Sequence, residues 1–177
     1  MNFRDLTANE IDVRIGMCKE NGVTLLLYKD ARCDMAILDE TVGAGNWERE
    51  HYECKGNLFC KVGIKVKQKV IDEATGEQYT VTEWVYKSDC GTESNTEAQK
   101  GEASDSFKRA CFNWGIGREL YTAPFIWVPA DKCNITAQGK CFDNFEVEKI
   151  IIEDKKIKAI SIMNTTKGQR CYVWQKQ

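Results

Sequence analysis

The segment from Thr96 to Gly115 constrains the fold of this chain more than any other. Its apolar residues recur at helical spacing and form one stripe: Ala103, Phe107, Ala110, Cys111 and Trp114. Thr96 and Gln99 are spaced as a capping box, and Gly115 is a typical residue for a helix end. Lys108 and Arg109 lie off the stripe. We therefore predict a long helix that is packed on a core and presents two adjacent cations outward, a rigid mount for anions.

Before this helix the periodicity changes to two, which is typical of strands. The pattern predicts three strands joined by hairpin loops at Lys55–Asn57 and at 72–76. The strands are Trp47–Cys54, Leu58–Ile71 and Tyr79–Ser88. In the middle strand every lysine has the same parity, so one face is apolar and the other is a row of ammonium groups. The row consists of Lys61, Lys65, Lys67 and Lys69.

Two interpretations of the lysine row are open. It can be a solvated face whose lysines pair with acidic residues on neighbouring strands, with Glu50, Glu53 and Glu83 as the candidates. Together with Lys108 and Arg109 it can instead form a continuous basic track. We favour the second interpretation, because Lys108 and Arg109 lie on the helix that follows this sheet in the chain.

The N-terminal part predicts a helix, a short strand and a second helix. Thr7 and Glu10 are spaced as a capping box, and an inner face of Ile11, Ile15 and Cys18 predicts that the first helix ends at 21–22. A strand over 23–28 follows. Asp30 is then expected to cap a helix that ends at 43–45. Arg32 in its first turn is a candidate anion ligand, because the helix dipole disfavours a cation there unless it has another role; the alternative is a surface ion pair with Asp39 or Glu40.

The C-terminal part predicts three strands over 145–152, 157–163 and 170–174, after a surface segment that contains Pro124 and Pro129. The 125–127 segment is apolar and is a candidate subunit interface. The fold class is therefore α+β, an antiparallel β-β-β-α core with the long helix packed across the sheet and an additional C-terminal β-meander. We predict a single domain over 1–177, with N-terminal elements over 1–46, sheet and long helix over 47–121, and C-terminal strands over 122–177.

Composition excludes several classes of function. The 177 residues carry 25 Lys+Arg against 27 Asp+Glu, a formal charge of −2, which argues against a diffuse polycation but allows a local basic track. Nine cysteines with no Cys-x-x-Cys indicate reduced thiols in a cytoplasm rather than a disulfide framework. With one histidine, His51, we expect no metal site. No phosphate-binding loop, catalytic motif, signal peptide or membrane span is evident, so we expect no cofactor, no enzymatic activity and no membrane association.

The segment from Asp105 to Gly115 resembles the "D-x-x-K-R-A-x-x-x-[F/W]-G" helix of the Rad52-type single-strand annealing proteins. Bacteriophage relatives are more similar, since their "K-R-A-C…W-G-I-G-R-x-L-Y" matches 108–121. Upstream, the helix with Arg32, followed by 45–47 and a hairpin, is similar to the family's "R…G-x-x-G-W" entry into its sheet. The resemblance extends over about 26–121.

The resemblance implies a protein that anneals complementary strands without ATP in recombination and repair. It implies a homo-oligomeric ring with single-stranded DNA along an outer groove, in the host cytoplasm if the gene is a bacteriophage one, with a single-strand-binding protein as a possible partner. By position, Arg32, Lys108 and Arg109 belong to the inner DNA site. Phe112 occupies the position of a further arginine in eukaryotic members, and Arg118 is a candidate substitute. The four lysines of the row correspond to the family's hairpin lysines.

Two other classes of function remain open. The first is a metal-dependent phage DNA-processing enzyme such as a nuclease, which would need convergent carboxylates and would cleave DNA with Mg²⁺. The second is a structural or interaction protein whose lysine row pairs with acidic neighbours, which would show no salt-sensitive DNA binding.

Overall fold

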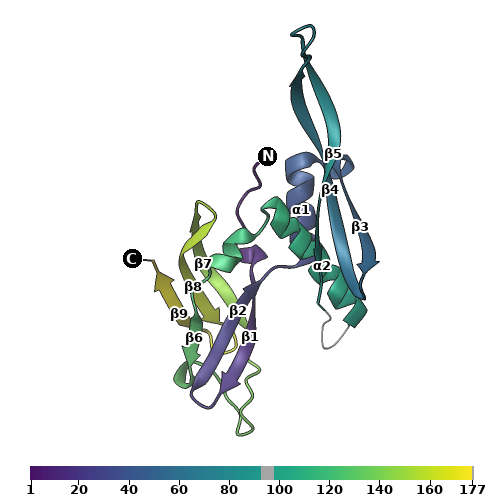
Figure 1. Cartoon of the computed structure of the whole chain (residues 1–177). Coiled ribbons are helices and arrows are strands. Elements are labelled where there is room, and N and C mark those ends of the chain that lie inside the picture. Colours follow the sequence, from purple (N-terminus) through teal and green to yellow (C-terminus); the bar gives the residue numbers. More distant parts are fainter. Residues whose placement is uncertain (93–97, 177) are drawn as a thin grey trace. The chain divides into compact units, whose positions relative to one another are not determined.

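The computed structural model describes residues 1–92 and 98–176, and its fold is α+β with antiparallel sheets, as predicted (Figure 1). Internal contacts divide the chain into two compact units. The first unit consists of Met1–Phe3 and Ala31–Ile116, and the second consists of Arg4–Asp30 and Gly117–Gln177. The second unit is therefore built from two segments that are far apart in the sequence.

The first unit contains a three-stranded antiparallel sheet in the order β3-β4-β5. The strands are β3 (Trp47–Cys54), β4 (Asn57–Ile71) and β5 (Gln78–Cys90), so all three predicted strands are confirmed with small changes at their ends. Lys55 and Gly56 join β3 to β4 with φ values of 53° and 75°. Two successive positive φ values are those of the type I′ turn, which matches the twist of the strands it joins.

Two helices complete the first unit. Helix α1 (Ala31–Val42) begins directly after Asp30, as predicted. Helix α2 (Ala98–Trp114) ends immediately before Gly115, whose φ of 103° explains why a glycine stops the helix here. The predicted cap at Thr96 lies outside the described residues. Helix α2 lies along the sheet and contacts β4 and β5 (Figure 1).

The alternation of β4 decides which face of the sheet meets α2. Cys60, Val62 and Ile64 share one parity and are all completely buried. Gly91, just after β5, lies so close to α2 that an added Cβ would be 2.2 Å from the carbonyl oxygen of Glu102. The apolar parity of β4 and this close approach together fix α2 on one face of the sheet, and the lysine parity occupies the other.

The second unit is a six-stranded antiparallel sheet in the order β6-β2-β1-β7-β8-β9. Its strands are β1 (Asp12–Lys19), β2 (Gly22–Tyr28), β6 (Ile126–Pro129), β7 (Phe145–Glu153), β8 (Lys156–Asn164) and β9 (Gln169–Gln175). The last three strands form the predicted C-terminal meander. The outermost strands β6 and β9 contact each other, and the Tyr172 hydroxyl donates to the Phe125 carbonyl at 3.1 Å, so the sheet curls toward closure (Figure 1).

The predicted first helix is wrong. Only the 3₁₀ turn Ala8–Glu10 forms there, and the chain then continues as β1, which pairs with β2. The apolar residues at 11, 15 and 18 fit a helical period, but Val13 between them also fits a period of two. Val13 and Ile15 are β-branched, Gly16 is a poor helix former, and pairing with β2 satisfies the backbone of the whole segment.

The segment after Arg118 also differs from the prediction. The prediction placed this segment on the surface, but part of it forms β6, which pairs with β2. Ile126 and Val128 of β6 are only 2% and 0% exposed. Of the predicted interface segment, only Phe125 is exposed, to 76%. In the described part of the chain, neither helix is long and apolar enough to cross a membrane.

Two ion pairs of the second unit make its stability sensitive to acid. Arg4 holds Glu10 at 2.7 Å, and Arg170 holds Glu148 at 2.6 Å, and each arginine lowers the pKa of its partner carboxyl from 4.5 to about 2. Because the folded state then binds fewer protons than the unfolded state, the stabilisation is present above about pH 4.5 and is lost as pH falls toward 2.

We therefore expect the free energy of unfolding, measured with urea, to fall between pH 5 and pH 3. The variant Glu148→Gln should show a smaller fall, because it has no carboxyl to protonate at this site. An equal fall in the variant and the wild type would contradict a role for the Glu148–Arg170 pair in this pH dependence.

Candidate nucleic-acid interface

Helix α2 is anchored on the sheet by its apolar stripe, as predicted. Phe107 is 1% exposed, and Cys111 is completely buried. The ring of Trp47 stacks on that of Phe107 with 6.2 Å between centroids, and the guanidinium of Arg49 lies 4.8 Å from the same ring. Trp114 donates from Nε1 to the Val62 carbonyl at 3.0 Å. These contacts hold the middle and the C-terminal end of the stripe on the sheet, so the backbone positions from which the other side chains of the helix extend are fixed.

Lys108 and Arg109 are both half-buried on this helix. The Nε atom of Arg109 is 3.4 Å from Oδ1 of Asp89 on β5, and its side chain is 39% exposed. Nη2 of Arg109 donates to the same oxygen at 3.4 Å, so Asp89 sets the position of a guanidinium whose side chain remains partly exposed.

Sequence reasoning missed a further cation at the C-terminal end of α2. Lys87 on β5 donates from Nζ to the Asn113 carbonyl at 2.8 Å, and the same ammonium lies 4.7 Å from the centre of the Trp114 ring. A cation at this end of a helix is favoured by the helix dipole. Only the register of β5 against α2 could have revealed it, because Lys87 is far from Asn113 in the sequence.

The lysine row of β4 lies on the sheet face opposite to α2. Cross-strand partners share a face, and the register pairs Lys61 with Glu50 and with Ser88, and Lys65 with Trp84. The buried residues that contact α2 have the other parity. The sheet therefore lies between the row and the pair Lys108–Arg109, and the two groups do not form one continuous track within a subunit.

The four lysines of the row have different surroundings. Lys61 pairs with Glu50 at 2.8 Å, and this carboxylate raises the pKa of Lys61, so the acidic-neighbour interpretation holds for this lysine. Lys65 donates to the Gly45 carbonyl at 3.1 Å. Lys67 and Lys69 are exposed and, in the described residues, make no ion pair. The other two predicted acidic partners, Glu53 and Glu83, have the opposite parity, and Glu83 accepts from Gln68.

The remaining predicted ligands lie on other elements. Arg32 is exposed in the first turn of α1, a helix that contacts α2 in the same unit. Asp39, its predicted alternative partner, accepts from Nε1 of Trp47 at 2.7 Å. Arg118 is exposed at the start of the 3₁₀ helix Arg118–Thr122 and belongs to the second unit. The structure therefore groups Arg32, Lys108 and Arg109 on packed helices and the row on the far face.

The histidine and the cysteines, all in the described part of the chain, do not form a metal site. In residues 1–92 and 98–176, no cluster of His, Cys, Asp and Glu could hold a metal ion. The ring Nε2 of His51 lies 3.0 Å from the Ala103 carbonyl and so links β3 to α2. The nine cysteines are free, and burial raises the pKa of the Cys60 and Cys133 thiols to about 11.

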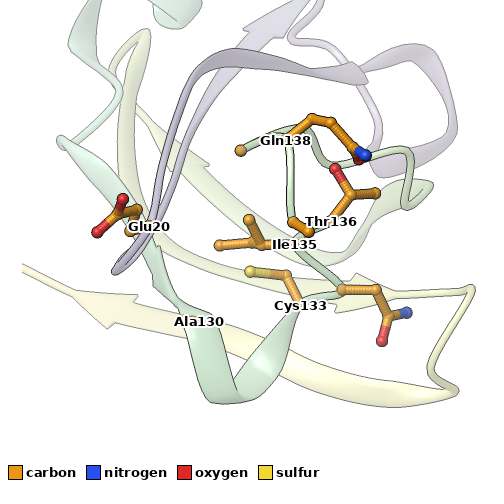
Figure 2. Close-up of a pocket in the computed structure, with 9 residues that line it drawn as sticks. Glu20, Ala130, Cys133, Ile135, Thr136 and Gln138 are labelled. Atoms are coloured by element: carbon orange, nitrogen blue, oxygen red, sulfur yellow. The ribbon is translucent and has the colours of Figure 1, made fainter.

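The second unit contains an open pocket of about 770 Å³, shown in Figure 2. Figure 2 shows Glu20 on one side of the pocket and Thr136 and Gln138 on the other, with Ile135 and Cys133 between them. None of the residues that line it is cationic, and one is acidic. The pocket is therefore unsuited to hold phosphate, and the cationic groups of the first unit remain the candidate interface.

Comparison with known protein families matches residues 4–138 to the family described as Rad52/22 family double-strand break repair protein. The chain belongs to the Rad52/22 family. The match includes all of α1, the three-stranded sheet and α2, and in the second unit it extends through β6. The meander β7–β9 lies beyond it. Neither the curated proteins nor the solved structures contain a significant match.

Membership of the Rad52/22 family places the chain among proteins of DNA repair and recombination. The residues that led to the resemblance, from Asp105 to Gly115, lie inside the matched range and form the anchored part of α2.

Proposed function

We propose that this protein binds single-stranded DNA and anneals complementary strands during recombination and repair, without ATP and without breaking bonds. The observation that carries the proposal is the pair Lys108–Arg109 on a helix that Phe107 and Cys111 fix in the core of a Rad52/22 family member. Because the packed helix fixes the backbone positions of these two cations, their side chains hold phosphates near defined positions and leave bases free to pair.

The primary DNA site in this proposal consists of Arg32, Lys108 and Arg109, with Lys87 as an added cation beside the end of α2. The row of Lys61, Lys65, Lys67 and Lys69 is a separate surface, and Arg118 is a further candidate ligand. Phe112 takes the place of an additional arginine. We also propose a bacteriophage origin and action in the host cytoplasm, with a single-strand-binding protein as the partner that is displaced from DNA.

The direct test is a fluorescence assay of annealing between complementary oligonucleotides at several salt concentrations, without nucleotide. We expect acceleration over the spontaneous rate that declines as salt rises, because phosphate contacts release counterions. Cleavage of labelled DNA that requires Mg²⁺ would support a nuclease instead. If the protein bound no DNA at any salt concentration, a structural or interaction role would be supported instead.

We further propose that the protein acts as a closed homo-oligomer, in which the primary site repeats around a ring. A subunit of net charge −2 offers few aligned cations, whereas repetition gives a continuous track and raises binding through multivalency. The outer strands β3 and β5 of the three-stranded sheet have edges at which a second copy could pair.

Mass measurement by light scattering at micromolar concentration should give a multiple of the 20.2 kDa subunit. Dilution with the same assay provides the control for non-specific association, because a closed ring keeps its mass until it dissociates cooperatively. A strict monomer that still anneals strands efficiently would contradict the ring.

A further inference from the structure

The lysine face of the three-stranded sheet carries two adjacent exposed aromatic rings. Trp84 and Tyr86 on β5 are 36% and 42% exposed, and their ring centroids are 6.2 Å apart with 24° between planes. Lys65 lies 5.1 Å from the centre of the Trp84 ring, and Lys61 lies 5.1 Å from the centre of the Tyr86 ring. The face is therefore a ladder of alternating rings and ammonium groups rather than a row of lysines alone.

The backbone holds both rings in place. Tyr86 is opposite Gly63, where an added Cβ would be 2.4 Å from the Tyr86 ring, so the ring lies across the neighbouring strand because that position is a glycine. Its hydroxyl donates to Glu48 at 2.7 Å. Lys65, which covers Trp84, is tied to the Gly45 carbonyl. Ordering these rings on a ligand therefore costs little conformational entropy.

We propose that bases of single-stranded DNA stack on Trp84 and Tyr86 of this face, whose lysines Lys67 and Lys69 are the candidate phosphate ligands that the family resemblance implies. It rests on the proposed function and adds to it the mode of contact. Exposed aromatic rings on an antiparallel sheet, with cations beside them, form the arrangement on which unpaired bases stack. Lys67 and Lys69 extend the row along β4 up to the turn, which itself carries the acidic residues Asp72, Glu73 and Glu77.

The occupant is DNA rather than a protein because of how the charges are distributed. The acidic residues of this face, Glu48 and Glu50, are engaged with Tyr86 and Lys61 at one end. Beyond Trp84 the paired positions on β5 are Thr82 and Thr80, so the lysines there face neutral residues. Single-stranded DNA stacked on this face has its bases turned toward the protein, so the face binds the DNA but does not expose its bases to a complementary strand.

The test is binding of fluorescent oligo(dT) to the full chain in which Trp84 and Tyr86 are both replaced by leucine. We expect the affinity to fall about tenfold or more while the salt dependence stays unchanged, because stacking releases no counterions. The double variant Lys67→Ala/Lys69→Ala should instead lower the slope of log affinity against log salt by about 0.7 for each lysine. Trp84→Phe retains a ring and should recover much of the binding.

Tyr79→Leu is the matched control, since Tyr79 is 50% exposed on the same strand and has the opposite parity. It should bind as the wild type does. Wild-type affinity of the Trp84→Leu/Tyr86→Leu protein would overturn the inference and leave the proposed function intact. If that variant instead lost oligomeric mass, and its DNA binding fell only as much as the loss of oligomer explains, the face would be a subunit interface and the inference would be overturned. A wild-type protein that binds no single-stranded DNA would instead end the proposed function itself.

Discussion

Phe107→Ala should lower the free energy of unfolding by about 3–5 kcal/mol, a large part of the 5–15 kcal/mol that is typical of a domain. The Phe107 side chain is 1% exposed and stacks on Trp47, so its removal leaves a cavity between α2 and the sheet. It also removes the ring that the Arg49 guanidinium covers. Denaturant unfolding followed by circular dichroism measures the change.

Phe112→Ala is the matched control, because Phe112 is on the same helix and is only half-buried. Its effect on stability should be clearly smaller. Trp114→Ala should also act through stability, since the indole donates to the Val62 carbonyl. A Phe107→Ala or Trp114→Ala protein that remains fully stable and loses only DNA binding would show that α2 is oriented differently from our description.

The double variant Lys108→Ala/Arg109→Ala should weaken binding of single-stranded DNA and flatten its dependence on salt. Each lost phosphate contact lowers the slope of log affinity against log salt by about 0.7, so two contacts have a large combined effect. Titration of a labelled oligonucleotide at several salt concentrations measures both quantities.

Lys108→Ala alone separates the DNA effect from the ion pair, because Arg109→Ala also leaves Asp89 without the guanidinium 3.4 Å away. Lys100→Ala controls for the loss of one charge, since Lys100 is exposed near the other end of α2. If affinity and slope of the folded double variant both equal those of the wild type, these two residues do not bind phosphate.

The fold could be predicted from the sequence wherever the spacing of apolar residues fitted only a helix or only a strand. Apolar and polar residues alternate in β3–β5 and in the meander β7–β9, a pattern that does not fit a helix. The apolar residues of α2 recur every three to four positions, a pattern that does not fit a strand. The sequence does not reveal the N-terminal strand β1, because Ile11 and Ile15 fit both a helical period and a period of two. There, pairing with β2 outweighs the local preference. Strand β6 has only four residues, too few for its alternation to be detected.

The residues of the candidate interface also divide into those that the sequence reveals and those that only the structure reveals. The pair Lys108–Arg109 and the lysine row are visible in the sequence, because each lies on one element and its residues are a few positions apart. The association of Trp84 with Lys65 and of Tyr86 with Lys61 is not visible, since the two pairs are 19 and 25 positions apart in the sequence and the hairpin register alone brings them together. The position of Lys87 at the end of α2 has the same origin.

The sequence by itself therefore determined α2, the strands of the first sheet and the C-terminal meander, together with the apolar side of α2 and of β4, because periodicity is a property of a single segment. The tertiary structure decided that α2 covers one face of the β3–β4–β5 sheet and the lysine row occupies the other. The physical reason is that β4 must bury Cys60, Val62 and Ile64 against the helix, and alternation then places every lysine of the row on the opposite face.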